Sequence, residues 1–215
     1  MKTAVCYYFA MRTAEPKSPG AAGVPPPDPS AWVDQHGDAL FRYAILRVKN
    51  EHLAEDLIQD TFLGALKGLG RFKPGSSDRA WLMAILKHKI IDHYRKDVIE
   101  IPSADLNLWE EEDDREYFDK TGHWKRDLKD WKDSPEKLVE NAEFWETFQS
   151  CLLGLPESHR RTFALRELDG VKSEEVCEIL SITPSNLFVI LHRARSKLRK
   201  CLDTTWFNEP TEGKQ

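Results

Sequence analysis

Apolar residues recur at helical spacing in two separate stretches of the chain, residues 31–96 and 138–202. No stretch of any length alternates apolar and polar residues as a half-buried β-strand does. The intervening residues are strongly acidic and show little apolar periodicity. Because amphipathic helices must bury their apolar faces against other elements, the pattern predicts an all-α protein with two small helical domains joined by a long acidic linker.

The same pattern divides the whole chain into five parts. The beginning is rich in proline among glycine, alanine and serine, a composition typical of a disordered leader. The expected parts are a disordered leader at 1–29, a first helical domain at 30–97, the acidic linker at 98–137, a second helical domain at 138–203 and a tail at 204–215.

Composition excludes a membrane protein and favours a reduced, cytoplasmic one. No apolar run approaches the roughly 20 residues that a membrane-spanning helix needs. The cysteines show no CxxC pair or Cys/His cluster, and Cys151, Cys177 and Cys201 lie in helical apolar patterns. We therefore expect reduced cysteines acting as small core residues, no bound metal and a cytoplasmic location. A redox switch is the alternative.

The net charge of −5 is unevenly distributed. Residues 181–202 contain no acidic side chain, and residues 71–96 contain two against seven lysines and arginines. Two basic segments separated by an acidic one are typical of two phosphate-contacting modules. Two solvated helix faces produce the same pattern, so charge alone does not decide between them.

The second basic segment has the pattern of a helix-turn-helix. Ser173 is placed to cap a first helix, a short turn follows at 181–183, and Thr183 with Pro184 begins a second helix. Four apolar residues of the second helix form one stripe, and Ser185, Val189, His192 and Ser196 are expected on the opposite side. The stripe consists of Leu187, Leu191, Ala194 and Leu198. A second helix of this kind can enter the major groove of DNA.

The first domain offers two further candidate surfaces. A predicted helix at 52–69 carries an acidic face, which is either solvated surface or a docking face for a basic partner. A polar loop at 71–77 then leads into a helix at 79–96 with a basic end, an arrangement suited to holding single-stranded DNA.

Two segments resemble a known family. The string AEDLIQDTFLGAL, followed by RFKPGSSDRAWLMAILKHKIIDHYRK, resembles region 2 of the extracytoplasmic-function (ECF) sigma factors in the sigma-70 family. LPESHRRTFALRELDGVKSEEVCEIL, followed by LHRARSKLRK, resembles their region 4. The two segments occur in the family's order and at its usual separation.

The resemblance implies a sigma factor that binds core RNA polymerase and directs promoter-specific transcription initiation, without enzymatic activity or a cofactor of its own. Region 2 would grip the clamp helices of the β′ subunit through Asp56, Gln59, Asp60 and Leu63. It would hold the −10 element through Arg71, Lys73, Ser76, Ser77, Arg79, Lys87, Arg95 and Lys96. Region 4 would meet the β flap and read the −35 element through Ser185, Asn186, Phe188, Val189, His192, Arg193, Arg195 and Lys197. An anti-sigma factor would control a stress- or signal-responsive protein of this kind.

One departure from the family affects how the second helix would read DNA. Family members usually carry polar or basic side chains where this chain has Phe188, Val189 and Ile190. Apolar groups can contact thymine methyls but cannot form the bidentate hydrogen bonds that read guanine. Packing on a neighbouring helix or partner is the alternative role for these residues.

Two other functions compete with this interpretation. A stand-alone helix-turn-helix regulator would need a sensor pocket or dimerisation element in residues 31–140, and the sequence indicates neither. A metal-dependent nuclease using Asp56 and Asp60 would lack a third ligand nearby. The regulator also leaves the match of the first domain unexplained.

Overall fold

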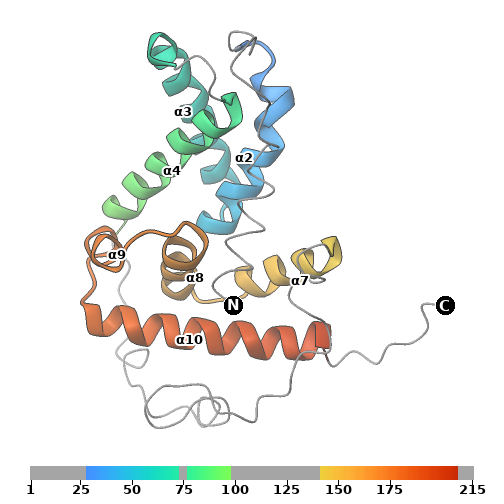
Figure 1. Cartoon of the computed structure of the whole chain (residues 1–215), viewed down its shortest axis with the longest axis vertical. Helices are drawn as coiled ribbons and strands as arrows, with labels where there is room; N and C mark the ends of the chain where they lie inside the picture. The colour runs from blue at the N-terminus through green and yellow to red at the C-terminus, as the bar shows by residue number, and fades with distance from the viewer. Residues whose placement is uncertain (1–27, 73–76, 98–140, 208–215) are drawn as a thin grey trace, which may run out of the picture. The chain divides into compact units, whose positions relative to one another are not determined.

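The computed structural model describes residues 28–72, 77–97 and 141–207 of the chain (Figure 1). Within these ranges the regular structure consists only of helices, which confirms the all-α prediction. The described residues belong to two compact units that divide between Val98 and Ile99. The predicted acidic linker and residues 1–27 of the predicted leader lie outside the described residues.

The described part of the first unit contains three α-helices that all contact one another. They are α2 (Trp32–Val48), α3 (Glu51–Gly68) and α4 (Asp78–Lys96), with a short 3-10 turn, η1 (Leu69–Arg71), after α3. Asn50 caps α3 by accepting a hydrogen bond from the Leu53 backbone N–H at 3.1 Å. Apolar side chains from all three helices form the core, and Leu40, Ala54 and Leu82 are fully buried in it.

An aromatic cluster joins the beginnings of α2 and α4. The Trp32 ring packs edge-on against Trp81 at 5.8 Å, and Phe72 packs against the same Trp81 ring at 5.1 Å. The Trp32 indole N–H also donates to the Asp78 carboxylate at 2.7 Å. The cluster thereby fixes both described ends of the polar loop, Phe72 on one side and the first turn of α4 on the other.

The second unit is arranged around its longest helix, α10 (Pro184–Leu202). Three other α-helices pack against α10: α7 (Ala142–Leu153), α8 (Glu157–Phe163) and α9 (Ser173–Leu180) (Figure 1). A π-helical turn, η3 (Ala164–Leu168), extends α8, and another, η4 (Asp203–Phe207), extends α10. The predicted apolar stripe of the last helix is buried against these neighbours.

The helix-turn-helix forms where the sequence predicts it, with one difference at its beginning. Thr183 caps α10, because its hydroxyl accepts from the Asn186 N–H at 3.2 Å, and Pro184 occupies the first helical position. The prediction that Ser173 caps α9 is wrong. Ser173 is already the first helical residue, and the cap position belongs to the extended Lys172, whose side chain makes no cap hydrogen bond.

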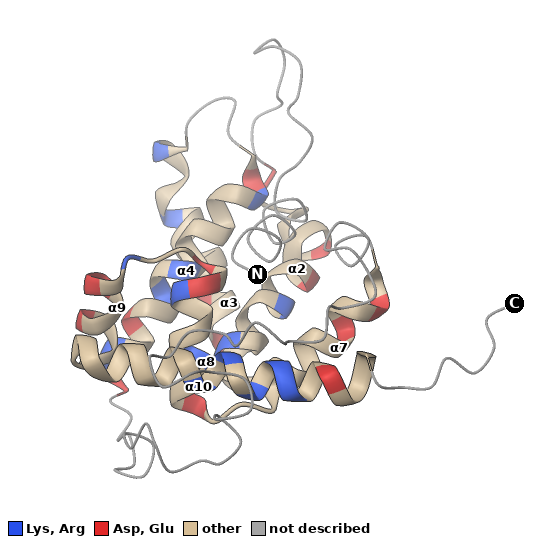
Figure 2. Ribbon diagram, turned by 60° about the horizontal axis from the view of Figure 1, so that its bottom comes forward, with Lys and Arg blue, Asp and Glu red and all other residues tan. Residues whose placement is uncertain are grey.

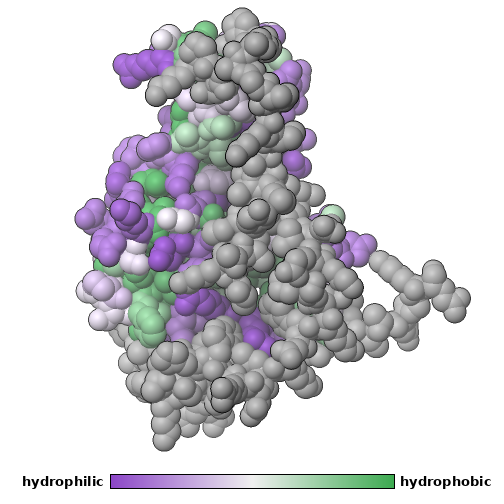
Figure 3. Space-filling view, in the orientation of Figure 1, coloured by the Kyte–Doolittle hydropathy of each residue, from purple (hydrophilic) through white to green (hydrophobic). Residues whose placement is uncertain are grey.

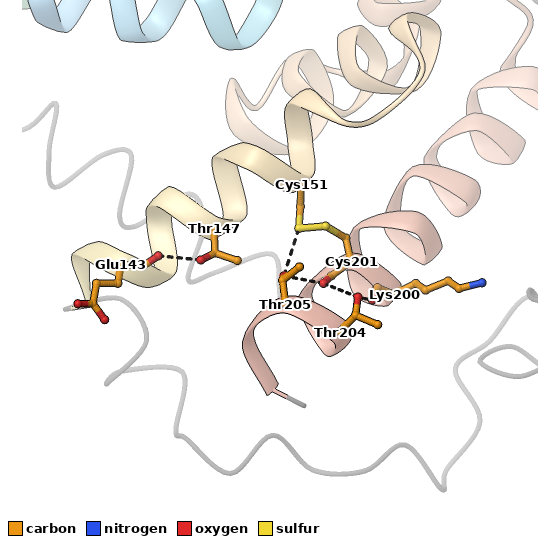
Figure 4. The surroundings of a disulfide bond; sticks show 7 residues. All are labelled: Glu143, Thr147, Cys151, Lys200, Cys201, Thr204 and Thr205. Atoms are coloured by element: carbon orange, nitrogen blue, oxygen red, sulfur yellow. Dashed lines mark hydrogen bonds between the residues drawn. A yellow bond between two sulfur atoms is a disulfide. The ribbon is translucent and has the colours of Figure 1, made fainter. Parts of the chain in front are cut away.

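The prediction of reduced core cysteines is wrong for two of them. Cys151 of α7 and Cys201 of α10 form a disulfide, with their Cα atoms 5.8 Å apart (Figure 4). Fifty residues separate them in the sequence, and only the packing of α7 along the last turns of α10 brings them together. Cys177 on α9 is free and partly exposed.

No helix in the described ranges has both the length and the apolar character that crossing a membrane would require. On the face shown in Figure 3, hydrophobic and hydrophilic residues are interspersed over the described surface.

Candidate functional site

The predicted acidic face lies on α3, opposite the buried side of that helix. Asp56, Gln59, Asp60 and Leu63 are all exposed, at spacings of three, one and three residues that place them on one helical face. Leu63 is 53% exposed, although large apolar side chains are more often buried. The structure therefore places all four predicted partner-binding residues together on an accessible surface.

Leu66 enlarges this surface beyond the four residues predicted from the sequence. It is 48% exposed and lies three residues beyond Leu63 on α3. The signal that could have identified it was its position outside the apolar stripe of the helix. Asp60 also forms an ion pair with Lys89 of α4 at 3.5 Å, which ties this surface to the neighbouring helix.

The basic residues predicted to contact single-stranded DNA lie at the end of η1 and along α4. Arg71, Arg95 and Lys96 are exposed, whereas Arg79 and Lys87 are half-buried. Arg95 pairs with Asp92 at 3.5 Å on the exposed surface. Ser77 is the residue before α4, and its side chain forms no cap bond. The other two predicted residues of this set, Lys73 and Ser76, lie outside the described residues.

The beginning of α10 presents a small mixed surface. Ser185 and Phe188 are exposed, one turn apart, and Asn186 beside them is half-buried. Phe188 is 56% exposed, which makes it an accessible aromatic side chain at the start of the second helix of the helix-turn-helix. This is the end of such a helix that contacts base edges in known complexes.

The prediction that α10 presents an outward face beyond its first turn is wrong. Val189, His192 and Ser196 are buried, with exposed fractions of 5–7%, and Arg193 is 2% exposed. The prediction assumed one buried stripe and therefore one packing neighbour. Three described helices, α7, α8 and α9, pack on α10, and the buried part of its surface extends well beyond the predicted stripe.

Arg195 is engaged inside the second unit. Its guanidinium donates to the Glu167 carboxylate at 2.6 Å, and Glu167 is only 11% exposed. The contact joins α10 to the π-helical turn η3. The neighbouring Arg166 of η3 donates to the Val171 carbonyl at 3.1 Å. Glu167 is thus a positioning residue for α10 that the sequence analysis missed, since nothing local links it to a helix 28 residues later.

The charges near the helix-turn-helix are segregated by helix. Figure 2 shows acidic residues on α9 and basic residues along α10. The acidic residues in the first turn of α9, Glu174 and Glu175, are stabilised by the positive end of the helix dipole. Lys197 is half-buried and Lys200 is exposed near the end of α10. These basic residues have the chemistry of phosphate contacts rather than of base readout.

Burial raises the pKa of the Cys177 thiol on α9, and the nearby Glu174 and Glu178 raise it further. No group of three or more His, Cys, Asp or Glu side chains suited to a metal ion occurs among the described residues.

Comparisons with known proteins match both units. A family model described as Sigma-70 region 2 matches residues 32–98, and one described as Sigma-70, region 4 matches residues 145–198. The chain is 38% identical over 164 residues to a probable RNA polymerase sigma factor of Haemophilus influenzae, covering 76% of this chain and 84% of the relative. It is 30% identical to the ECF RNA polymerase sigma factor EcfG of Rhodopseudomonas palustris, covering 76% of this chain and 79% of that protein.

A solved structure is also similar: the sigma factor RpoE of Bartonella quintana in complex with the anti-sigma factor NepR. It has 24% identity and a TM-score of 0.40, and it covers 78% of this chain and 92% of that one. The two family matches fall on the two structural units, one on each, and the sequence relatives share both. The chain therefore belongs to the ECF group of the sigma-70 family and is an RNA polymerase sigma factor.

Proposed function

We propose that this sigma factor docks on core RNA polymerase through the exposed face of α3 and contacts promoter DNA through both units. The observation that carries the proposal is the exposure of Asp56, Gln59, Asp60 and Leu63 on one face of α3. Three polar side chains around one exposed leucine suit a partner that combines basic groups with an apolar contact. The β′ clamp helices are the expected partner surface.

In the first unit, Arg71 and the basic residues of α4 would contact the backbone of the melted −10 element. Exposed guanidinium and ammonium groups support this role, because phosphate contacts dominate affinity for single-stranded DNA. The cluster of Trp32, Phe72 and Trp81 also supports this role, because it anchors both described ends of the loop. Lys73 and Ser76 remain predicted contacts of the loop itself.

In the second unit, the exposed beginning of α10 would read the −35 element as duplex. Ser185 and Asn186 can hydrogen-bond to base edges, and Phe188 can contact thymine methyl groups. Lys197 would contact phosphate. The buried Val189, His192 and Arg193 are not part of this proposal.

The protein would catalyse no reaction itself, because the polymerase carries out nucleotide addition. Its proposed place of action is the cytoplasm, where polymerase and promoters are. An anti-sigma factor that holds the free protein remains part of the proposal, as the family resemblance implies.

The first test is run-off transcription on fragmented genomic DNA of the source organism, with core polymerase in the presence and absence of the protein. New 5′ ends that share a spaced two-part upstream motif are the expected result. If core polymerase gains no new starts and the purified protein binds duplex sites unaided, a stand-alone regulator replaces the proposal.

A matched pair of variants tests the docking face. Leu63→Asp should abolish binding to core polymerase, because it places a charge in the centre of the proposed contact. Val33→Asp makes the same change at an exposed site on α2, where the side chain is 61% exposed, and should leave binding intact. Binding is measured by co-elution with core polymerase. Equal binding by both variants would exclude the α3 face as the docking surface.

A further inference from the structure

The Cys151–Cys201 disulfide connects α7, the first described helix of the second unit, to the end of α10 (Figure 4). Cys151 is 5% exposed and Cys201 is half-buried. Around the sulfur atoms, Thr205 donates to the Cys201 carbonyl at 2.7 Å, and its hydroxyl oxygen lies 3.8 Å from the Cys151 sulfur. The bond is therefore set within a structured contact between α7, α10 and η4.

Aromatic contacts also join α7 to η4. Phe144 of α7 packs against Trp206 of η4 at 5.6 Å, and against its own neighbours Trp145 and Phe148. Among the described elements, α7 has substantial contacts only with α10 and η4. The disulfide is thus the one covalent connection across the contact through which α7 joins the rest of its described unit.

The bond lies far from the proposed DNA-reading end of α10. Cys201 follows Ser185 by 16 residues, which corresponds to about 24 Å along a helix at 1.5 Å per residue. The sulfur atoms therefore cannot contact the bases that Ser185 or Phe188 would reach. Any influence of the bond on promoter reading acts through the stability of the unit that carries α10.

We propose that Cys151 and Cys201 are a reversible redox modification site, a thiol–disulfide pair that sets the stability of the second unit. In the disulfide form α7 and η4 are locked to α10. In the dithiol form only noncovalent packing holds them, and the end of the unit opens more readily.

The chemistry is thiol–disulfide exchange with a small-molecule disulfide of the glutathione class. The thiolate of one cysteine attacks the small disulfide and forms a mixed disulfide, releasing one small thiol. The thiolate of the second cysteine then attacks the sulfur of the first cysteine in this mixed disulfide. The attack forms the Cys151–Cys201 bond and releases the second small thiol. The cysteines lose two electrons and two protons, and the small disulfide gains them. For reduction, one thiolate of a dithiol attacks the Cys151–Cys201 bond at the half-buried Cys201 and forms a mixed disulfide, releasing Cys151 as its thiol. The second thiolate of the dithiol then releases Cys201 and closes the dithiol's own disulfide, so the dithiol loses the two electrons and two protons that the cysteines regain.

Cys177 supplies an internal control. It is the free cysteine among the described residues, and its thiol pKa is raised by burial and by Glu174 and Glu178. A raised pKa reduces the thiolate fraction at neutral pH, so Cys177 should exchange slowly. Cys177→Ser therefore removes a thiol without removing the pair.

The test uses the full chain in glutathione buffers of defined ratio, with thiols counted by maleimide mass labelling. On oxidation, wild type and Cys177→Ser should each lose two reactive thiols more than the matching chains in which Cys151→Ser and Cys201→Ser are combined, because the other cysteines are common to each pair of chains. On reduction, the unfolding midpoint of the second unit should fall by about 10 °C or more in wild type and Cys177→Ser. The double variant should show one low midpoint in both buffers.

Hydrogen exchange locates the effect. Reduction should increase exchange in peptides covering α7 and η4 in wild type, while exchange in the first unit stays constant. A wild-type chain that keeps all its thiols in the oxidising buffer overturns the inference. So does a pair that oxidises without changing either the midpoint or the exchange of α7 and η4.

Transcription provides the functional readout, and this part rests on the proposed function. At temperatures between the two midpoints, the oxidised holoenzyme should retain promoter-specific initiation that the reduced one loses. The double variant should be insensitive to the buffer, which also controls for effects on core polymerase. Thiol counts and exchange decide the inference without any transcription, so failure of the proposed function cannot be mistaken for failure of the redox site.

Discussion

The indole N–H of Trp32 donates a 2.7 Å hydrogen bond to the carboxylate of Asp78, joining the first turns of α2 and α4 across 46 residues of sequence. Trp32 is only 1% exposed and also packs on Trp81, so the bond forms at the edge of a buried aromatic contact. Because Asp78 begins α4, the bond fixes the side of the polar loop that leads into the proposed −10 contact.

Trp32→Phe should destabilise the first unit by about 1.5–3 kcal/mol, the usual contribution of a hydrogen bond to a charged group. The double variant with Asp78→Asn should cost less than the sum of the two single changes, because the residues interact directly. Urea unfolding followed by circular dichroism measures both. Asp92→Asn, which removes an exposed 3.5 Å pair with Arg95, is the control and should change stability by less than about 1 kcal/mol. Additive effects of Trp32→Phe and Asp78→Asn would contradict the coupling.

The ion pair between Glu167 and Arg195 should be worth more than an ordinary surface pair, because Glu167 is 11% exposed. Glu167→Gln should destabilise the second unit by about 1–3 kcal/mol, since it removes the charge that Arg195 contacts. Arg195→Lys should recover part of the stability of Arg195→Ala by keeping a cation near Glu167. Thermal unfolding measures the three variants, and equal midpoints for Arg195→Lys and Arg195→Ala would show that charge pairing is not what Arg195 contributes.

Gly170 has a positive φ of 66° between η3 and α9, a conformation that residues with a Cβ adopt at a cost. Gly170→Ala should therefore destabilise the second unit by about 1–2 kcal/mol, even though a Cβ there would meet no atom within 4 Å. Gly37 lies inside α2 with the same open space around it. Gly37→Ala should instead stabilise the first unit, by up to about 1 kcal/mol, because alanine favours the helix. Urea unfolding should show a lower free energy of unfolding for Gly170→Ala and a higher one for Gly37→Ala. Changes of the same sign in the two variants would contradict the role given to the positive φ of Gly170.

Phe188 should make promoter reading sensitive to thymine methyl groups. Replacing thymines of the mapped −35 element one at a time by uracil removes only the methyl. At a contacted position, initiation should fall about fourfold, the equivalent of burying one methyl group at about 0.8 kcal/mol. Phe188→Ala should make thymine and uracil templates equivalent, whereas Ser185→Ala should keep the difference. Full methyl sensitivity in Phe188→Ala would exclude this contact.

Sequence periodicity predicted the helices and the exposed face of α3 because both depend on local geometry. The buried and exposed sides of α3 follow directly from its apolar spacing, so Asp56 and Leu63 were placed correctly on the outside. Thr183 and Pro184 likewise predicted the beginning of α10, since capping involves residues within one turn.

The second unit was predicted less well where a residue's surroundings depend on several packed helices. A helical wheel of α10 shows which residues share a side but not how much of the helix is covered in the folded chain, where Val189 and His192 are buried. The partners of Arg195 and Cys201 lie 28 and 50 residues away along the chain. Their pairing depends on which turns of α7, η3 and α10 come into register.

The amino-acid sequence by itself therefore determined the helical class, the two-part organisation, the family and the side of α3 that faces outward. These follow from the period of the helix and from motifs that are contiguous in the chain. Only the tertiary structure decided that Cys151 meets Cys201, that Glu167 holds Arg195 and that Phe188 is the accessible aromatic residue at the start of α10. The physical reason is that side-chain contacts between distant helices depend on packing distance and helix rotation, which no local pattern specifies.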